Sequence, residues 1–278
     1  MSLACHKLKI KVIEYQHGFI NDYYNMYTNW KNLPNNGFEL LPDIFWVWAE
    51  DNAIKINEWS SKTNKHKAKI VYCPPYTLLK SFVEKTKKTN IKIGAQDCHT
   101  QPNYGPYTGG ISSKMIKDLG CKFVIIGHSE TRAENNNKKI NLKIKSALDE
   151  KLNIILCIGE KLVDKNKNKT KNVLKKQLLE GLKNLSNLNK VIIAYEPVWS
   201  IGTGIIPSEN DLIKNIKFIK DTLKKSKKFT KSKVLYGGSV NPKNIKNLMR
   251  ISNIDGFLIG GASTNEKIFI DIIRKSII

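Results

Sequence analysis

Short apolar runs alternate with longer lysine-rich stretches from about residue 68 to the end of the chain. The runs are rich in β-branched residues and continuously apolar, as strands buried on both faces of a parallel sheet should be. The longer stretches have helical spacing, so the pattern predicts repeated strand–helix units around a parallel sheet. The predicted strands are Ile70–Cys73, Ile91–Gln96, Phe123–Gly127, Ile154–Ile158, Val191–Glu196, Val234–Gly237 and Gly256–Ile259.

The lysine-rich stretches place Leu and Ile three and four residues apart, which predicts amphipathic helices packed outside the sheet. An eighth strand is expected upstream at Asn25–Thr28, followed by a helix within Phe45–Thr63, in the least regular part of the chain. We find no Gly/Ser-rich linker and no sequence repeat, so one barrel-sized domain is expected. The remaining predicted helices are Glu134–Lys151, Thr170–Leu185, Asn210–Lys224 and Asn241–Leu248.

Eight strand–helix units form either a closed barrel or an open doubly wound sheet, and the glycines favour the barrel. A dinucleotide-binding sheet carries G-x-G-x-x-G after its first strand, and no such motif occurs near residues 28–35 or 73–80. Instead, glycine turns follow the last two strands, at Gly237–Ser239 and Gly260–Ser263, where barrels often bind phosphate. The prediction is a single α/β domain, a (β/α)8 barrel over residues 23–278, after an N-terminal extension over residues 1–22.

Composition and charge exclude several classes of protein. Of the 278 residues, 41% are hydrophobic and 26% charged, which is typical of a globular protein and not of a disordered one. The net charge of +23 could attract nucleic acid, but among 47 basic residues only Arg132, Arg250 and Arg274 are arginine. Without clustered cations or interleaved aromatics, no nucleic-acid partner is expected. No apolar run reaches the ~18–20 residues of a membrane span, so no membrane partner is expected.

The cysteines and the first residues of the chain bear on its compartment. Five widely spaced cysteines, with no C-x-x-C pair, argue against a complete disulfide framework and favour a reducing compartment. Residues 1–22 lack the apolar core of a secretory signal. The cytoplasm is therefore expected. A plastid or another organelle is the alternative, because the first 20 residues are basic and contain a single acid, Glu14.

Residues that can carry chemistry follow the predicted strands. Lys31, His128 and Glu196 stand where loops leave the carboxyl ends of strands, and in a barrel these ends converge on one opening. Removal of a proton from carbon beside a carbonyl needs a carboxylate base, a hydrogen-bond donor for the enediolate oxygen and an anchor for the substrate. Glu196, His128 and the Gly/Ser turns supply these groups, and Lys31 adds positive charge. We expect no metal and no organic cofactor.

Five short motifs, taken in order, resemble those of the triosephosphate isomerase family. They are GHSETR (127–132), CIGE (157–160), AYEPVWSIGTG (194–204), YGGSV (236–240) and GFLIGGAS (256–263). Each motif alone is moderate support, whereas five in this order are hard to obtain by chance. The resemblance covers about residues 23–278 and implies a (β/α)8 TIM barrel that interconverts dihydroxyacetone phosphate and D-glyceraldehyde 3-phosphate. It also implies a homodimer whose substrate is a small phosphorylated triose.

The resemblance assigns roles to individual residues. Glu196 corresponds to the base that moves a proton between adjacent carbons, and His128 to the neutral imidazole that donates to the carbonyl oxygen, both established roles in this family. Asn29 and Lys31 match its substrate-binding Asn-x-Lys, in which Lys31 is expected to act in catalysis too. The other assignments are phosphate-binding N–H groups of Gly202, Ser239, Gly260 and Gly261, supporting residues Ser129 and Glu130, and the apolar pair Ile201 and Leu258 that closes over the base.

Three departures from the family pattern add expectations, and two rival functions stay open. Only Ile205–Ile206 separates the last lid glycine from the next proline, so a shortened lid hinge is expected to weaken catalysis. Gly110 and Thr131 replace a carboxylate and a guanidinium at the family's dimer interface, and Asp97 stands where Asn is usual.

The runner-up function is a degenerate barrel paralogue that binds phosphate with little turnover. A basic nucleic-acid-binding protein is the weaker alternative.

Overall fold

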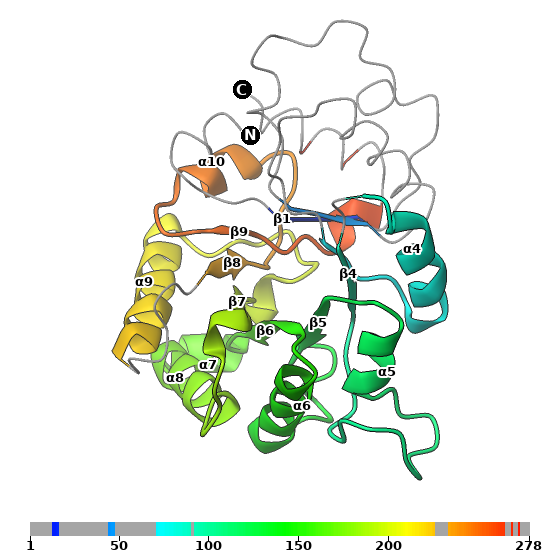
Figure 1. Cartoon of the computed structure of the whole chain (residues 1–278). Helices are drawn as coiled ribbons and strands as arrows, with labels where there is room; N and C mark the ends of the chain where they lie inside the picture. Colours follow the sequence, from blue (N-terminus) through cyan, green and yellow to red (C-terminus); the bar gives the residue numbers. More distant parts are fainter. Residues whose placement is uncertain are drawn as a thin grey trace, which may run out of the picture.

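The chain forms a parallel sheet whose strands follow one another in sequence order (Figure 1). The structure, a computed structural model, describes residues 13–16, 44–47, 71–89, 92–225, 233–264, 268 and 272. Each of the seven predicted apolar runs coincides with one strand of the main sheet to within two residues, which confirms this part of the prediction. The strands are β3 (Val71–Tyr72), β4 (Lys92–Ala95), β5 (Phe123–Ile126), β6 (Asn153–Ile158), β7 (Val191–Tyr195), β8 (Val234–Tyr236) and β9 (Gly256–Phe257).

Helices connect successive strands and lie outside the sheet (Figure 1). Parallel neighbours require such crossover connections, because a short turn cannot return the chain to the starting edge. The helices are α4 (Leu79–Thr86), α5 (Ser113–Asp118), α6 (Asn137–Asp149), α7 (Leu162–Asn166), α8 (Thr170–Gly181), α9 (Glu209–Lys225) and α10 (Ile245–Arg250). Short 3-10 turns are η2 (Tyr76–Leu78), η3 (Leu188–Lys190), η4 (Val198–Ser200) and η5 (Gly261–Thr264).

The predicted helices are confirmed with shifted boundaries, since α6 begins at Asn137 instead of Glu134 and α8 ends at Gly181 instead of Leu185. Helix α10 begins at Ile245 and not at Asn241, because the residues between them form an asparagine turn. Asn241 Oδ1 accepts hydrogen bonds from the backbone N–H groups of Lys243, at 2.8 Å, and Asn244, at 3.2 Å. Asparagine side chains compete in this way with the helical backbone and favour positions just before a helix.

The helix expected within Phe45–Thr63 is wrong at its start. Phe45–Val47 belongs to a strand, β2 (Ile44–Val47), and the rest of the expected helix lies outside the described residues. The sequence of β2, Ile-Phe-Trp-Val, consists of β-branched and aromatic residues, which pack well on a pleated surface. A run this short carries no periodicity that separates a strand from a helix.

A strand also occurs inside the segment expected to be an extension. β1 (Ile13–Gln16) pairs in parallel with β2. β1 lies beside β9 and η5, and β2 lies beside β3, so this pair stands between the two edge strands of the main sheet. The strand expected at Asn25–Thr28 lies outside the described residues. The boundary between extension and barrel after residue 22 stays a prediction.

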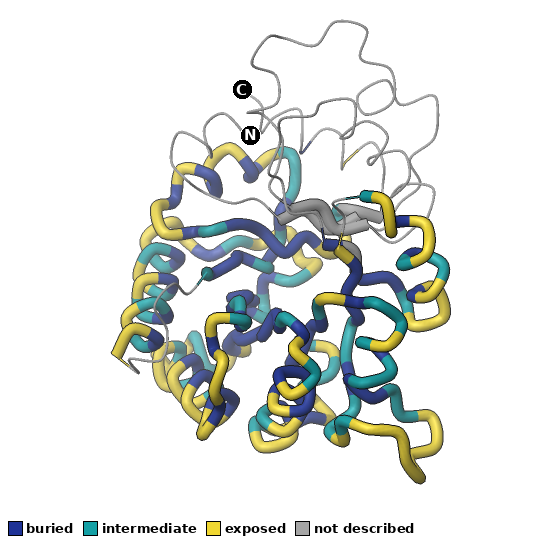
Figure 2. Tube along the Cα trace, in the orientation of Figure 1, coloured by how far each residue is buried: buried dark blue, intermediate teal, exposed yellow. Residues whose placement is uncertain are grey.

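The core fills the space between the sheet and its helices (Figure 2). Strand β6 is buried from Ile154 to Ile158, as expected for a strand covered on both faces. Helix α9 buries Leu212, Ile216, Ile219 and Leu223, three or four residues apart, and exposes its other lysines, whereas Lys220 is half-buried and pairs with Asp255 at 2.7 Å. These rows of apolar side chains fix each helix against the sheet and thereby fix the ends of the strands.

Membrane spans and metal clusters were sought within the described ranges. There, no helix is long and apolar enough to cross a membrane. In the same ranges, no three His, Cys, Asp or Glu side chains gather as a metal site would require. The described cysteines, Cys73, Cys98, Cys121 and Cys157, are free and buried.

Candidate active site

Three neighbouring strands end in register, which brings the residues after them to one edge of the sheet. Ile158 of β6 lies opposite Tyr195 of β7, which lies opposite Tyr236 of β8. The next residues continue this ladder: the Glu196 N–H donates to the Ile158 carbonyl at 2.7 Å, and the Gly237 N–H donates to the Tyr195 carbonyl at 2.9 Å. Glu196 and Gly237 therefore lie side by side at the carboxyl end of the sheet, where barrels place their active sites.

Glycines on both sides of Glu196 leave room for it. A Cβ at Gly159 would lie 1.7 Å from the Glu196 carbonyl oxygen, and a Cβ at Gly237 would lie 2.7 Å from Glu196 Cγ. Neither distance is compatible with van der Waals contact, so larger residues would displace Glu196. Leu258 is buried beyond Gly237, its Cβ 3.3 Å from the place of a Gly237 Cβ. The structure thus brings Leu258 close to the expected base.

The Glu196 side chain is almost completely removed from solvent. The residue is 2% exposed, and burial raises the pKa of its carboxyl above the ordinary value, because the charged form loses its hydration. His128, a hydrogen bond from the Cys157 thiol and the charge of Arg132 lower this pKa, but by less than burial raises it. A carboxylate with a raised pKa binds a proton more strongly, which is the property a carbon base needs.

His128 lies directly across from Glu196. Its Nε2 is 3.6 Å from Glu196 Oε1. Its other ring nitrogen, Nδ1, accepts a hydrogen bond from the backbone N–H of Glu130 at 3.4 Å. A nitrogen that accepts carries no proton, so the proton of a neutral ring is on Nε2 and points toward Glu196. The site therefore presents an N–H donor beside a buried carboxylate.

Of the two residues expected to support His128, Glu130 contacts the imidazole ring through its backbone N–H. Glu130 orients the ring with its N–H, whereas its carboxylate is 83% exposed and lies 3.7 Å from Nδ1, where solvent weakens the interaction. Ser129 is half-buried in the same turn. Thr131 and Arg132 close this turn, because both backbone N–H groups donate to the His128 carbonyl at 3.0 Å. Thr131 also donates from its hydroxyl to that carbonyl, at 3.0 Å.

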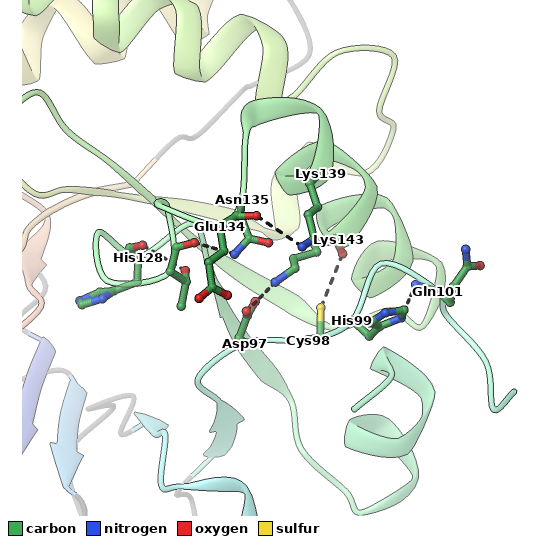
Figure 3. A network of polar contacts seen from close by, with 10 residues as sticks. Asp97, Cys98, His99, Gln101, His128, Glu134, Asn135, Lys139 and Lys143 are labelled. Carbon is green, nitrogen blue, oxygen red and sulfur yellow. Dashed lines mark hydrogen bonds and ion pairs between the residues drawn. The ribbon is translucent and has the colours of Figure 1, made fainter. Parts of the chain in front are cut away.

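A polar network extends from this turn to helix α6 and to the end of β4 (Figure 3). Asn135 is buried and donates from its side chain to the Thr131 carbonyl at 2.6 Å. Lys143 of α6 is buried and forms an ion pair with Asp97 at 2.5 Å. The unusual Asp97 is thus matched by a cation within the same chain. The network anchors the segment that carries His128 to its neighbours.

A second buried carboxylate follows β6, at a position that the sequence analysis did not single out. Glu160, after β6, is 1% exposed, and burial raises its pKa. The Trp199 indole N–H donates to Glu160 Oε1 at 2.8 Å, and the Tyr195 hydroxyl donates to Oε2 at 3.2 Å. Glu160 belongs to the quoted CIGE motif, so its signal was present as a charged residue directly after a buried strand.

The loop after β7 reaches back to the end of β8. The Gly204 N–H donates to Ser239 Oγ at 3.1 Å, so the short hinge lets the loop contact that turn. Gly202 has a φ of +68°, a conformation that glycine adopts without strain, and Ile201 beside it is half-buried. The effect of the hinge on catalysis stays a prediction.

The other expected ligand-binding groups fall into two sets. Gly260 and Gly261, after β9, are exposed, and a Cβ at either position would meet no atom within 4 Å. Asn29 and Lys31 lie outside the described residues, and the structure does not test their roles.

Together, the barrel and the Glu196–His128 pair define an isomerase of the TIM-barrel class. The family model described as "Triosephosphate isomerase" matches residues 49–276. The chain belongs to the triosephosphate isomerase family, and it interconverts dihydroxyacetone phosphate and D-glyceraldehyde 3-phosphate. The match begins after Asn29 and Lys31, so it leaves their assignment open.

Individual relatives agree with this assignment. The triosephosphate isomerase of Wolbachia pipientis wMel is 42% identical over 220 residues, which cover 79% of this chain and 86% of the relative. That of Dictyoglomus turgidum is 44% identical over 213 residues, covering 74% of this chain and 85% of the relative. The crystal structure of triosephosphate isomerase from Bartonella henselae superposes with a TM-score of 0.69 at 33% identity, covering 81% of this chain and 91% of the other.

Proposed function

We propose that Glu196 is the base of the isomerisation and that His128 is its hydrogen-bond donor. The Glu196 carboxylate takes a proton from C1 of dihydroxyacetone phosphate, and the C–H electron pair forms the C1–C2 double bond. The carbonyl electrons move onto O2, where the His128 Nε2–H stabilises the negative charge. Return of the proton to C2, with transfer of a proton between the oxygens, gives glyceraldehyde 3-phosphate.

The observation that carries this proposal is the 3.6 Å approach of His128 Nε2 to Glu196 Oε1 inside a largely buried site. Burial raises the pKa of Glu196, which strengthens it as a base for carbon. Because the Glu130 N–H donates to His128 Nδ1, the proton of the neutral ring stays on Nε2, the nitrogen that faces the substrate in this proposal. Both groups are positioned before substrate binds, so little reorganisation is needed during the reaction.

Backbone N–H groups at the strand ends form the proposed phosphate site. Gly202, Gly260 and Gly261 have no Cβ to block a close approach, and amide donors suit the three phosphate oxygens. The Ser239 N–H would complete the set, and it now donates to Ser200 Oγ at 3.3 Å. We assign Asn29 to substrate binding and Lys31 to substrate binding and charge stabilisation.

Isomerisation kinetics of the purified protein and of Glu196→Gln test this assignment. The chain should be produced in a host that lacks its own triosephosphate isomerase. We expect isomerase activity in the parent and a fall of roughly 10²–10⁴-fold in kcat for Glu196→Gln, the usual size of a general-base contribution. Equal trace activity in both proteins would favour the degenerate paralogue. Lys31→Met, assayed in parallel, should raise KM and lower kcat, and an unchanged KM would remove Lys31 from the substrate site.

We further propose a homodimer, with the loop between β4 and α5 in the interface. This loop, residues 100–112, projects from the body of the molecule and is largely exposed (Figure 2). Tyr104 is 58% exposed and Tyr107 is 39% exposed, and aromatic residues are enriched at protein interfaces. Sedimentation at micromolar concentration should show a dimer that Tyr107→Asp weakens, whereas a monomeric parent would contradict the proposal.

For the compartment, we propose the cytoplasm. The free, buried cysteines suit a reducing environment. Fusion of residues 1–22 to a fluorescent protein tests the alternative, because a targeting segment would direct the reporter to an organelle.

A further inference from the structure

Arg132 joins the turn after β5 to strand β6. Its backbone N–H donates to the His128 carbonyl at 3.0 Å, inside the turn. Its side chain leaves the turn, and Nη2 of the guanidinium donates at 2.8 Å to the carbonyl of Cys157, a residue of β6. One residue therefore fixes the segment that carries His128 to the strand beside it.

A glycine makes room for this contact. A Cβ at Gly127 would lie 3.3 Å from Arg132 Nη2 and 3.1 Å from the Cys157 carbonyl oxygen, both closer than ordinary van der Waals contact. Gly127 directly precedes His128 in the chain, so the guanidinium packs against the backbone at the start of the turn. A larger residue at position 127 would push the guanidinium away from β6.

Two helices orient the other arm of the guanidinium. Nη1 donates to Asn137 Oδ1 at 3.0 Å, and the Asn137 side-chain amide donates to Glu180 Oε2 at 2.9 Å. Asn137 is the first residue of α6, and Glu180 belongs to α8. A planar guanidinium that donates from both arms is held in one orientation, whereas the ammonium of a lysine is a point charge on a flexible stem.

The described residues leave the charge of Arg132 without a paired carboxylate. Among them, no Asp or Glu lies within ion-pair distance of the guanidinium, and Nε is buried with no hydrogen-bond partner. A buried donor without a partner costs stability. Such costs are typical of functional sites, where a group is held in place for its chemistry and not for the stability of the fold.

Glu196 is a carboxylate on which this charge acts. Burial raises the pKa of Glu196 and lowers the pKa of Arg132, and the attraction between the two groups opposes both shifts. The other ionisable groups that act on Glu196 come from the turn after β5 and from β6; they are His128, Glu130 and Cys157. Of these four groups, the guanidinium is the one that stays positive over the whole working pH range.

We propose that Arg132 is a positioning residue, whose guanidinium holds the turn that carries His128 against β6 and gives the active site a permanent positive charge. The inference rests on the proposed function, in which Glu196 takes a proton from the substrate and His128 donates to its oxygen. The guanidinium is engaged with Cys157 and Asn137, so it acts through the two catalytic groups and not on the substrate. Its loss should disturb the 3.6 Å approach of His128 Nε2 to Glu196 Oε1.

Two substitutions separate the hydrogen bonds of Arg132 from its charge. Arg132→Lys keeps the charge but cannot donate from two arms in one plane, so it cannot bond Cys157 and Asn137 together. Arg132→Gln keeps a neutral donor and loses the charge. Arg250→Gln, at the exposed end of α10, is the matched control for the loss of one cation. Melting temperatures show whether each variant is folded.

We expect kcat to fall about 10–10²-fold in both Arg132 variants, because misplaced reacting groups slow the chemical step. KM, and competitive inhibition by inorganic phosphate, should stay close to the parent values. The acid midpoint of kcat/KM should rise by about one pH unit in Arg132→Gln, because the carboxylate loses a nearby positive charge. The midpoint should stay at the parent value in Arg132→Lys and in Arg250→Gln.

The pH midpoint separates a positioning role from a merely structural one. A lower kcat in Arg132→Gln with an unmoved midpoint would overturn the proposal, as would parent-like kinetics in both Arg132 variants or a loss of phosphate inhibition. If Arg132→Gln does not fold, Arg132→Lys decides, because an unchanged kcat overturns the proposal and a lower kcat with an unmoved midpoint supports it. Failure of the proposed function looks different: Glu196→Gln would then keep its activity, whatever happens at Arg132.

Discussion

The Trp199 indole N–H donates a hydrogen bond of 2.8 Å to Glu160 Oε1, which joins the loop after β7 to the end of β6. Lys165 of α7 covers the same indole ring, its Nζ 3.7 Å from the ring centroid. Burial raises the pKa of Glu160, and the bond from Trp199 lowers it. The loop that carries Ser200 and Gly202 therefore contacts the buried Glu160 through Trp199 and the turn after β8 through the bond from Gly204 to Ser239.

We expect Trp199→Phe to destabilise the protein more at pH 8 than at pH 4. Without the indole donor the folded pKa of Glu160 rises further above its unfolded value. Stability from a raised pKa is present below the unfolded pKa and lost as pH rises through the folded one. The added loss at pH 8 should be about 1–3 kcal/mol, from denaturant titrations at both pH values. Loss of packing is the same at both, so a pH-independent deficit would contradict the bond.

Glu196→Gln should be more stable than the parent at pH 8, although we expect it to lose most of its activity. Burial raises the folded pKa of Glu196, so ionisation of this group costs stability as pH rises through that pKa. A neutral amide avoids the cost. The gain in melting temperature should shrink as pH falls toward the ordinary glutamate pKa of about 4.3. Glu134→Gln, at an exposed position, serves as the control and should change the melting temperature little.

The same raised pKa should appear in the pH–rate profile. Because Glu196 must be ionised to accept a proton, kcat/KM should fall with acid, with a midpoint above the ordinary glutamate value of about 4.3. The profile of the free enzyme, measured with substrate well below KM, reports this midpoint. A midpoint at or below 4.3 would mean that burial does not control the base.

Gly237→Ala should lower activity while the protein stays folded. The added Cβ would lie 2.7 Å from Glu196 Cγ, so the carboxylate must move away from its place opposite His128. A displacement near 1 Å at a reacting group costs about 10²-fold in rate. Gly181→Ala, at the end of α8, is the matched control, because its Cβ would approach other atoms no closer than 3.9 Å. Equal kcat in both variants would contradict the close fit around Glu196.

The main sheet could be predicted because its strands are buried on both faces. A run such as Ile154–Ile158 stays apolar at every position, and the lysine-rich stretches around it cannot be confused with it. Glu196 and His128 could be proposed from their places after such strands together with the resemblance. Their mutual approach needed the structure, since it depends on the register of β5, β6 and β7.

Other features depend on contacts that a linear pattern does not contain. Glu160 and Ser200 look like ordinary polar residues near strand ends, and only the packing of Trp199 and Tyr236 around them shows that they are buried. The prediction of a helix at Phe45–Val47 was wrong because a short aromatic run has no distinctive period and the partner strand lies far away in sequence. Local sequence patterns identify helices and strands, whereas the burial of a single polar side chain depends on residues that lie far away in the sequence.

The ion pair between Asp97 and Lys143 gives the last prediction. Lys143 is 6% exposed, so removal of either partner leaves a charge in a largely dry place. Lys143→Met should therefore cost about 3 kcal/mol of unfolding free energy, the usual size for a broken buried pair. The double variant Lys143→Met, Asp97→Asn should recover most of this loss, because no unpaired charge remains.

Chemical denaturation of the parent, both single variants and the double variant measures the coupling between the two residues. Activity should stay near the parent level in the double variant, because neither side chain touches the proposed substrate site. A double variant as unstable as Lys143→Met alone would show that lysine packing, and not charge pairing, stabilises α6. The contact of Asp97 with Lys143 would then not explain why this chain has an aspartate where the family usually has an asparagine.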